Sequence, residues 1–198
     1  MSTSNPTQTT LRKYASDLMS LQSLFMTSLE KQQEAESLHQ KEAKQLLSQI
    51  LQALKEQRPE LEARLSHLGG NLKDSAKSKL AEFAGTASGM FDTVRTDPVS
   101  KMLRDDYALL SMMIVGYKML MTSAMTAQDE QLVKITEKHL NRLAQLITET
   151  SKVVPMVVAA ELEVEPGKAS SIGKQAVERT HRAWSQENIK AGSEIVSS

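Results

Sequence analysis

Apolar residues recur at helical spacing along the first part of the chain. With ~100° between successive residues of a helix, residues 11–29 place their large apolar side chains on one face, and residues 34–55 do the same. The first face holds Leu11, Tyr14, Leu18, Leu21, Phe25 and Leu29. The second holds Ala35, His39, Ala43, Leu46, Ile50, Ala53 and Leu54. We expect Arg58-Pro59 to break this helix or start a fresh turn, and Gly69-Gly70 to end the helical piece that follows.

A second pair of helices is predicted after residue 97. Asp97-Pro98 is a favourable helix start, with Asp as the N-cap and Pro in the first turn, and the pattern continues to about Thr126. Residues 127–129 allow only a short turn, so a fourth helix over residues 130–152 lies antiparallel to the third. Its inward face holds Leu132, Ile135, His139, Leu143, Leu146 and Ile147.

The long link between the two pairs decides the topology. Residues 69–97 are enough to let the second and third helices run parallel, which is the arrangement of ferritin-like bundles with one crossover. The pattern therefore predicts an all-α fold, a ferritin-like four-helix bundle of two antiparallel hairpins over residues 11–162. Residues 1–10 are expected to be a flexible N-terminus. Residues 163–198 are expected to be a polar and largely mobile tail, with a short helix near residues 175–190.

The third helix is apolar on two sides. Leu110, Ile114, Tyr117 and Met121 lie on one side, and Met112, Val115 and Met119 lie on the other. A helix that is apolar on both sides is buried on both sides. We therefore expect a homodimer through Met112, Val115 and Met119, or cover from the connector, in preference to a promiscuous Met-rich binding surface.

Composition narrows the classes of function. The 198 residues include no Cys, which excludes disulfides, thiolate metal sites and cysteine nucleophiles. The 24 basic and 24 acidic side chains balance, which gives no general electrostatic case for a nucleic-acid or membrane-surface partner. The apolar stretch over residues 112–121 is shorter than the ~20 residues of a membrane span, and residues 1–10 carry no apolar run typical of a signal peptide. A cytoplasmic protein is expected.

Several short segments follow one another in a distinctive order. They are His39-Gln40-Lys41-Glu42 with Leu46-Leu47 and Ile50, Leu72-Lys73-Asp74-Ser75, Lys79-Leu80-Ala81, Ser88-Gly89-Met90-Phe91, Asp97-Pro98-Val99 and Asp129-Glu130. In this order the chain, over about residues 11–162, resembles the stress-associated bacterial ferritin-like proteins of uncharacterised function. The resemblance implies the same helical fold and a stress-related role.

The resemblance also implies where metal ligands would stand. Ferritin-like di-iron sites take a Glu from each of two helices and a Glu-x-x-His pair from each of the other two. At the corresponding positions this chain has Gln22, Leu46 and Met113, while Glu42 is retained and His139 faces inward. Loss of the di-iron centre is the favoured interpretation.

One cluster of possible metal ligands remains. His39 and Glu42 are one helical turn apart, Glu36 lies at the edge of their face, and His139 is expected to face them across the bundle. Two imidazoles and a carboxylate suit Fe or Zn. The alternative, which we favour, is a hydrogen-bonded polar layer in the core.

Two classes of function follow from these alternatives. The first is a non-enzymatic stress-response or interaction protein that has lost the di-iron site. The second is a metal-binding protein for iron storage or peroxide detoxification at a reduced His/Glu site. A third possibility is an adaptor whose tail, with Trp184 among basic residues, recruits a protein partner.

Overall fold

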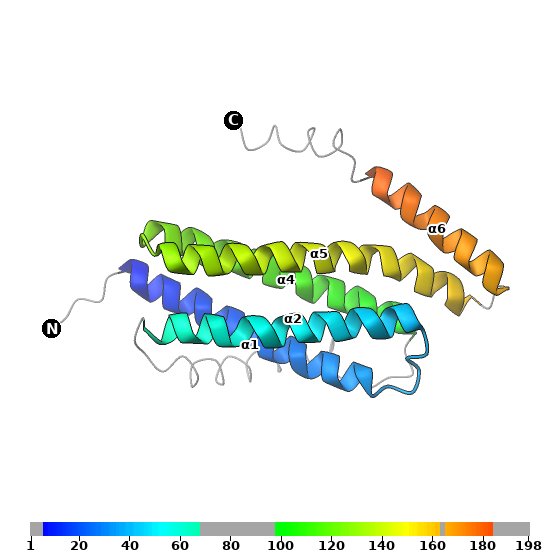
Figure 1. The fold of residues 1–198 in the computed structure, drawn as a ribbon, viewed down its shortest axis with the longest axis horizontal. Coiled ribbons are helices and arrows are strands. Elements are labelled where there is room, and N and C mark those ends of the chain that lie inside the picture. Colours follow the sequence, from blue (N-terminus) through cyan, green and yellow to red (C-terminus); the bar gives the residue numbers. More distant parts are fainter. Residues whose placement is uncertain (1–5, 68–97, 163–164, 184–198) are drawn as a thin grey trace.

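Helices account for almost all of the described chain. The computed structural model describes residues 6–67, 98–162 and 165–183 (Figure 1). Within these ranges the helices are α1 (Pro6–Gln33), α2 (Lys41–Ser66), α4 (Val99–Thr126), α5 (Glu130–Glu161) and α6 (Pro166–Ala183), and there is no strand. The prediction of an all-α protein is confirmed. The predicted connector, residues 69–97, lies outside the described ranges.

Four of the helices pack in a closed ring. Helix α1 packs against α2 and α4, and α5 also packs against α2 and α4. Helix α6 lies outside the ring and packs mainly against α5. Figure 1 shows that α1 and α2 run in opposite directions, that α4 and α5 do the same, and that α2 and α4 run the same way.

The ring closes around an aliphatic core. Fully buried large side chains include Tyr117, Phe25, Leu11, Met19, Leu29, Leu38, Leu47, Ile50, Leu54, Leu61, Leu65 and Leu103. The inward faces predicted for the first and fourth helices are buried at most positions, with Tyr14 and Ile147 half-buried. Leu, which makes up most of this set, suits both helix propensity and helix–helix packing.

Helix α2 begins later and ends later than its local pattern predicts. It starts at Lys41, after Gln40 in an extended conformation, and residues 34–40 form a turn held by backbone hydrogen bonds such as that from Leu38 N–H to Ala35 O at 3.1 Å. Pro59 does not break the helix, although it removes one backbone hydrogen bond. Leu61 and Leu65, two and six residues further on, are both fully buried, and this packing outweighs the local cost.

The turn between α4 and α5 is tied to α2 by one carboxylate. Asp129 is the N-cap of α5 and accepts a hydrogen bond from Leu132 N–H at 3.0 Å. The same oxygen, Oδ1, lies 2.6 Å from Nη2 of Arg64 near the end of α2. This pair fixes the C-terminal turns of α2 against the N-terminal turns of α5.

The N-terminus of α4 is capped from a distant segment. Pro98 is the N-cap and makes no side-chain capping bond, whereas Ser100 N–H donates to Oε1 of Glu161 at 2.9 Å. The prediction placed Pro98 one position later, inside the first turn. A carboxylate at a helix N-terminus satisfies a free N–H and complements the helix dipole, so the end of α5 supplies the cap.

The C-terminal part of the chain contains more helix than predicted. Helix α5 continues through Pro155 to Glu161, because burial of Val157 and Ala159 stabilises the additional turns. Helix α6 (Pro166–Ala183) begins earlier than the short helix predicted near residues 175–190 and packs back on α5 (Figure 1). Residues 184–190 of that prediction lie outside the described ranges.

Helix α4 is the most apolar of the described helices. In the described ranges it alone has the length and composition to cross a membrane, a property that core helices of soluble proteins share. The whole helix is longer than the apolar stretch of residues 112–121 considered above. One side contacts α1 and α5, and the exposed large apolar side chains on the other are Met112, Val115, Met119 and Met125.

Candidate functional site

The four residues predicted as a metal cluster do not share one environment. His139 is buried on α5, with 1% of its surface exposed. His39, Glu42 and Glu36 are all exposed, and His39 lies in the turn before α2 instead of on an inner helical face. The expectation that His39 and Glu42 point inward is therefore wrong.

The reason is a change of register in residues 34–40. Because the chain makes a turn there and α2 starts only at Lys41, Leu38 enters the core and His39 points to solvent. No local feature of the sequence distinguishes this turn from a continued helix, since its residues are as polar and helix-compatible as those that follow. In the ranges that the structure describes, no three His, Asp or Glu side chains gather in a group that could hold a metal ion.

Three positions that the resemblance assigns to iron ligands carry side chains that do not suit a di-iron centre. Gln22 and Met113 are fully buried and Leu46 is almost so, at the positions where the resemblance would have ligands. The Gln22 amide is used in packing, because its Nε2 donates to Leu54 O at 3.1 Å. Thioether and hydrocarbon side chains are poor ligands for iron, so these residues do not fit that centre.

His139 is instead the middle of a hydrogen-bonded layer that joins three helices. Its Nδ1 lies 3.1 Å from the hydroxyl of Tyr117 on α4, and its Nε2 lies 3.0 Å from Oε2 of Glu60 on α2. The rings of Tyr117 and His139 meet edge to face, with centroids 5.4 Å apart. Gln57 on α2 donates from Nε2 to the backbone oxygen of His139 at 3.3 Å.

These contacts define the protonation of the layer. A carboxylate accepts only, so Nε2 of His139 carries a proton and donates to Glu60, and Nδ1 of a neutral imidazole accepts from the Tyr117 hydroxyl. Burial lowers the pKa of His139 and outweighs the opposing effect of the Glu60 carboxylate. Hydrogen bonds from Lys138 and then His139 lower the pKa of Glu60, and burial raises the pKa of Tyr117. The layer therefore holds an ionised Glu60 beside a neutral His139.

Glu60 connects this buried layer to the surface. Its Oε2 accepts both from His139 and from the Lys138 ammonium, which is 2.8 Å away. Sequence reasoning missed Glu60, Gln57 and Lys138 as members of a site. Glu60 follows Pro59, where a helix break was expected, and the register that brings α2 against α5 has no local signature.

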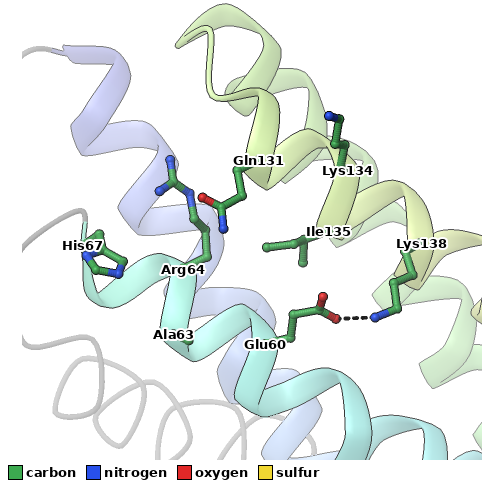
Figure 2. Close-up of a pocket in the computed structure, with 8 residues that line it drawn as sticks. All are labelled: Glu60, Ala63, Arg64, His67, Gln131, Lys134, Ile135 and Lys138. Carbon is green, nitrogen blue, oxygen red and sulfur yellow. Dashed lines mark hydrogen bonds and ion pairs between the residues drawn. The ribbon is translucent and has the colours of Figure 1, made fainter.

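A pocket opens beside Lys138, between the last turns of α2 and the first turns of α5. It has a volume of about 380 Å³. Its lining consists of Glu60, Ala63, Arg64, His67, Gln131, Lys134, Ile135 and Lys138. Figure 2 shows Glu60 and Lys138 facing one another from the two helices, with the Ile135 side chain between the helices.

A second hollow, of different character, lies between α1 and α4. It is an open groove of about 460 Å³. Its lining is Tyr14, Asp17, Leu18, Leu21, Ser111, Met112, Val115, Gly116 and Met119. Gly116 deepens it, since a Cβ there would lie 3.1 Å from Cδ1 of Leu18. The groove includes the three residues predicted as a dimer face.

Comparisons of this chain with protein-family models, with curated proteins and with solved structures find no match.

Proposed function

We propose that this chain is a ferritin-like four-helix protein without a di-iron centre, which acts in a stress response by binding protein partners and not as an enzyme. The ring of α1, α2, α4 and α5, with α2 parallel to α4, supports the fold assignment. The stress-related role rests on the sequence resemblance.

The observation that carries the proposal is the content of the interior. The one buried imidazole, in the described ranges, has both ring nitrogens bonded to protein groups, to Tyr117 and to Glu60. Gln22 and Met113 occupy ligand positions as packing residues. A buried imidazole whose two ring nitrogens are both bonded within the protein helps to stabilise and specify a core, which is a structural role.

Metal analysis tests this part of the proposal. Protein prepared without a His tag is expected to contain no stoichiometric Fe or Zn, and a His39→Ala/His139→Ala double variant is expected to give the same result. About one equivalent of metal that is retained through gel filtration and lost in the double variant would overturn the proposal. That result would favour the alternative, a metal-binding protein for iron storage or peroxide detoxification.

The partner that the surface fits best is a second copy of this chain. Met112 and Val115 are 46% and 54% exposed, and they border the groove that Gly116 deepens. Projecting apolar side chains and an apolar hollow therefore lie on the same face. We propose that this face pairs with the same face of a second chain about a two-fold axis, as in symmetric dimers. Such pairing would bury an apolar surface that monomers rarely expose.

The oligomeric state tests the choice of partner. Light scattering after gel filtration is expected to give a dimer for the natural chain and a monomer for Val115→Glu. Ile172→Glu is the matched control, because Ile172 is 42% exposed on α6, outside the groove lining, and this variant is expected to remain dimeric. A natural chain that is monomeric at every concentration tested, or equal behaviour of the two variants, counts against the dimer.

A further inference from the structure

The pocket between α2 and α5 has the chemistry of a binding site. Cationic side chains on its rim outnumber carboxylates, with Arg64, Lys134 and Lys138 against Glu60. Ile135 and Ala63 provide apolar wall, and the methylene stems of the Lys and Arg side chains extend it. Small-molecule sites typically combine such an apolar wall with a few polar groups that fix orientation.

The cations retain donors for a ligand after their internal contacts are counted. Lys138 has three N–H donors and gives one to Glu60. Arg64 uses Nε and Nη2 on Asp129, which leaves Nη1. Lys134 is exposed and has no ion pair with any residue that the structure describes. The three cationic groups are balanced by only two carboxylates, Glu60 and Asp129, so the pocket keeps a net positive charge.

The position of Glu60 limits what the pocket accepts. Its carboxylate is held by Lys138 and His139 on one wall, so an anion avoids that wall and is drawn to Lys134 and Arg64. A ligand with one anionic group and a short apolar body satisfies both halves of the pocket. The apolar body then lies against Ile135.

We propose that this pocket binds a small organic anion, its phosphate or carboxylate held by Lys134 and Arg64 and its apolar body packed on Ile135 and Ala63. The site is separate from the α1–α4 groove, because the two linings share no residue. This proposal therefore stands independently of the proposed dimer and of whether the protein binds a metal ion.

The test uses phenyl phosphate as the probe, with inorganic phosphate and phenol as its two halves. Binding is followed in the full chain by calorimetry and by backbone amide chemical shifts, at constant ionic strength. Phenyl phosphate is expected to saturate a single site and to shift amides in residues 60–67 and 131–138. Its affinity is expected to exceed that of each half by at least ~10-fold, because both halves of the pocket contribute.

Variants place the site. Lys134→Gln is expected to weaken phenyl phosphate binding by ~5-fold or more, whereas Lys152→Gln is expected to leave it unchanged. Lys152 is a matched control, since it is also exposed on α5 but lies 18 residues, or about five helical turns, beyond Lys134. No saturable binding, equal affinities in the two variants, or shifts outside these ranges would overturn the site. Equal affinity for inorganic phosphate and phenyl phosphate would overturn the apolar half of the proposal.

Discussion

Asp106 carries a carboxyl group that is completely buried on α4. Gln32 Nε2 donates to its Oδ1 at 3.0 Å, and its Oδ2 has no partner among the described residues. Burial raises the pKa of Asp106 to about 7, with a further small rise from the neighbouring Asp105 and an opposing effect of the Gln32 bond. Ionising this buried carboxyl group costs free energy, so the folded protein favours the neutral acid.

This buried acid makes stability depend on pH. The pKa of Asp106 in the folded protein lies above the unfolded value of 3.8. Its contribution to the free energy of unfolding is therefore fully present below pH 3.8 and is lost as the pH rises towards 7. Asp106→Asn is expected to remove this loss, and its stability relative to the natural chain should rise by on the order of 2 kcal/mol between pH 5 and pH 8. Urea unfolding at the two pH values measures the difference.

Asp105→Asn is the control for this experiment. Asp105 is only partly buried and pairs with Arg104 at 2.7 Å. Its variant removes a carboxylate from the same turn of α4 but keeps the buried Asp106, so the fall in stability between pH 5 and pH 8 should persist. A gap between Asp106→Asn and the natural chain that is the same at pH 5 and pH 8 would show that Asp106 does not titrate in this range.

The Tyr117 hydroxyl is the second residue-scale determinant. It is fully buried and donates to Nδ1 of His139. Tyr117→Phe keeps the ring and its packing but leaves a buried imidazole nitrogen without a partner, which costs ~1–3 kcal/mol. Urea unfolding of Tyr117→Phe beside Tyr107→Phe, a half-buried tyrosine on the same helix, measures the effect. Equal stability of the two variants would remove Tyr117 from the polar layer.

At the scale of elements, the attachment of α6 to α5 depends on one glycine. A Cβ at Gly173 would lie 2.6 Å from Sδ and 3.0 Å from Cα of Met156. An alanine there therefore requires the Met156 side chain to move and the backbones of α5 and α6 to separate by a few tenths of an ångström. At Gly167, near the start of the same helix, a Cβ would meet nothing within 4 Å.

These two glycines form a matched pair of substitutions. Ala favours a helix over Gly by up to ~1 kcal/mol at both positions, so propensity alone predicts stabilisation. Gly173→Ala is instead expected to push α6 off α5 and to speed amide hydrogen exchange in residues 166–183, while Gly167→Ala should slow it or leave it unchanged. Slower exchange in Gly173→Ala would mean that α6 is not held by this close contact.

Elements were predictable where a long apolar stripe decides them. The stripe of α1 and the short turn of residues 127–129 before α5 were predicted from the local pattern, and the structure has both. The helix break expected at Pro59 does not occur, and α5 continues through Pro155 beyond its predicted end at residue 152, since buried residues beyond each proline offset the lost hydrogen bond. Local rules cannot weigh tertiary packing that is supplied by a helix elsewhere in the chain.

The candidate site was predictable only in part, for the same reason. His139 lies on a regular inward stripe, and its burial followed from that stripe. Its partners Glu60 and Tyr117 are 79 and 22 residues away. Which atoms meet depends on the relative shift of α2, α4 and α5 along their axes, and helical periodicity fixes the face of a helix but not this shift.

At the scale of the whole molecule, the proposed dimer makes stability depend on protein concentration. If two chains bury the α1–α4 groove against each other, mass action favours the folded dimer over unfolded monomers. The thermal midpoint of the natural chain should therefore rise by a few degrees over a 100-fold increase in concentration. In Val115→Glu, which places a carboxylate on the groove face, the midpoint should be independent of concentration. A midpoint that is constant in both chains would mean that the folded monomer is stable alone and that the exposed Met112 and Val115 side chains serve another partner.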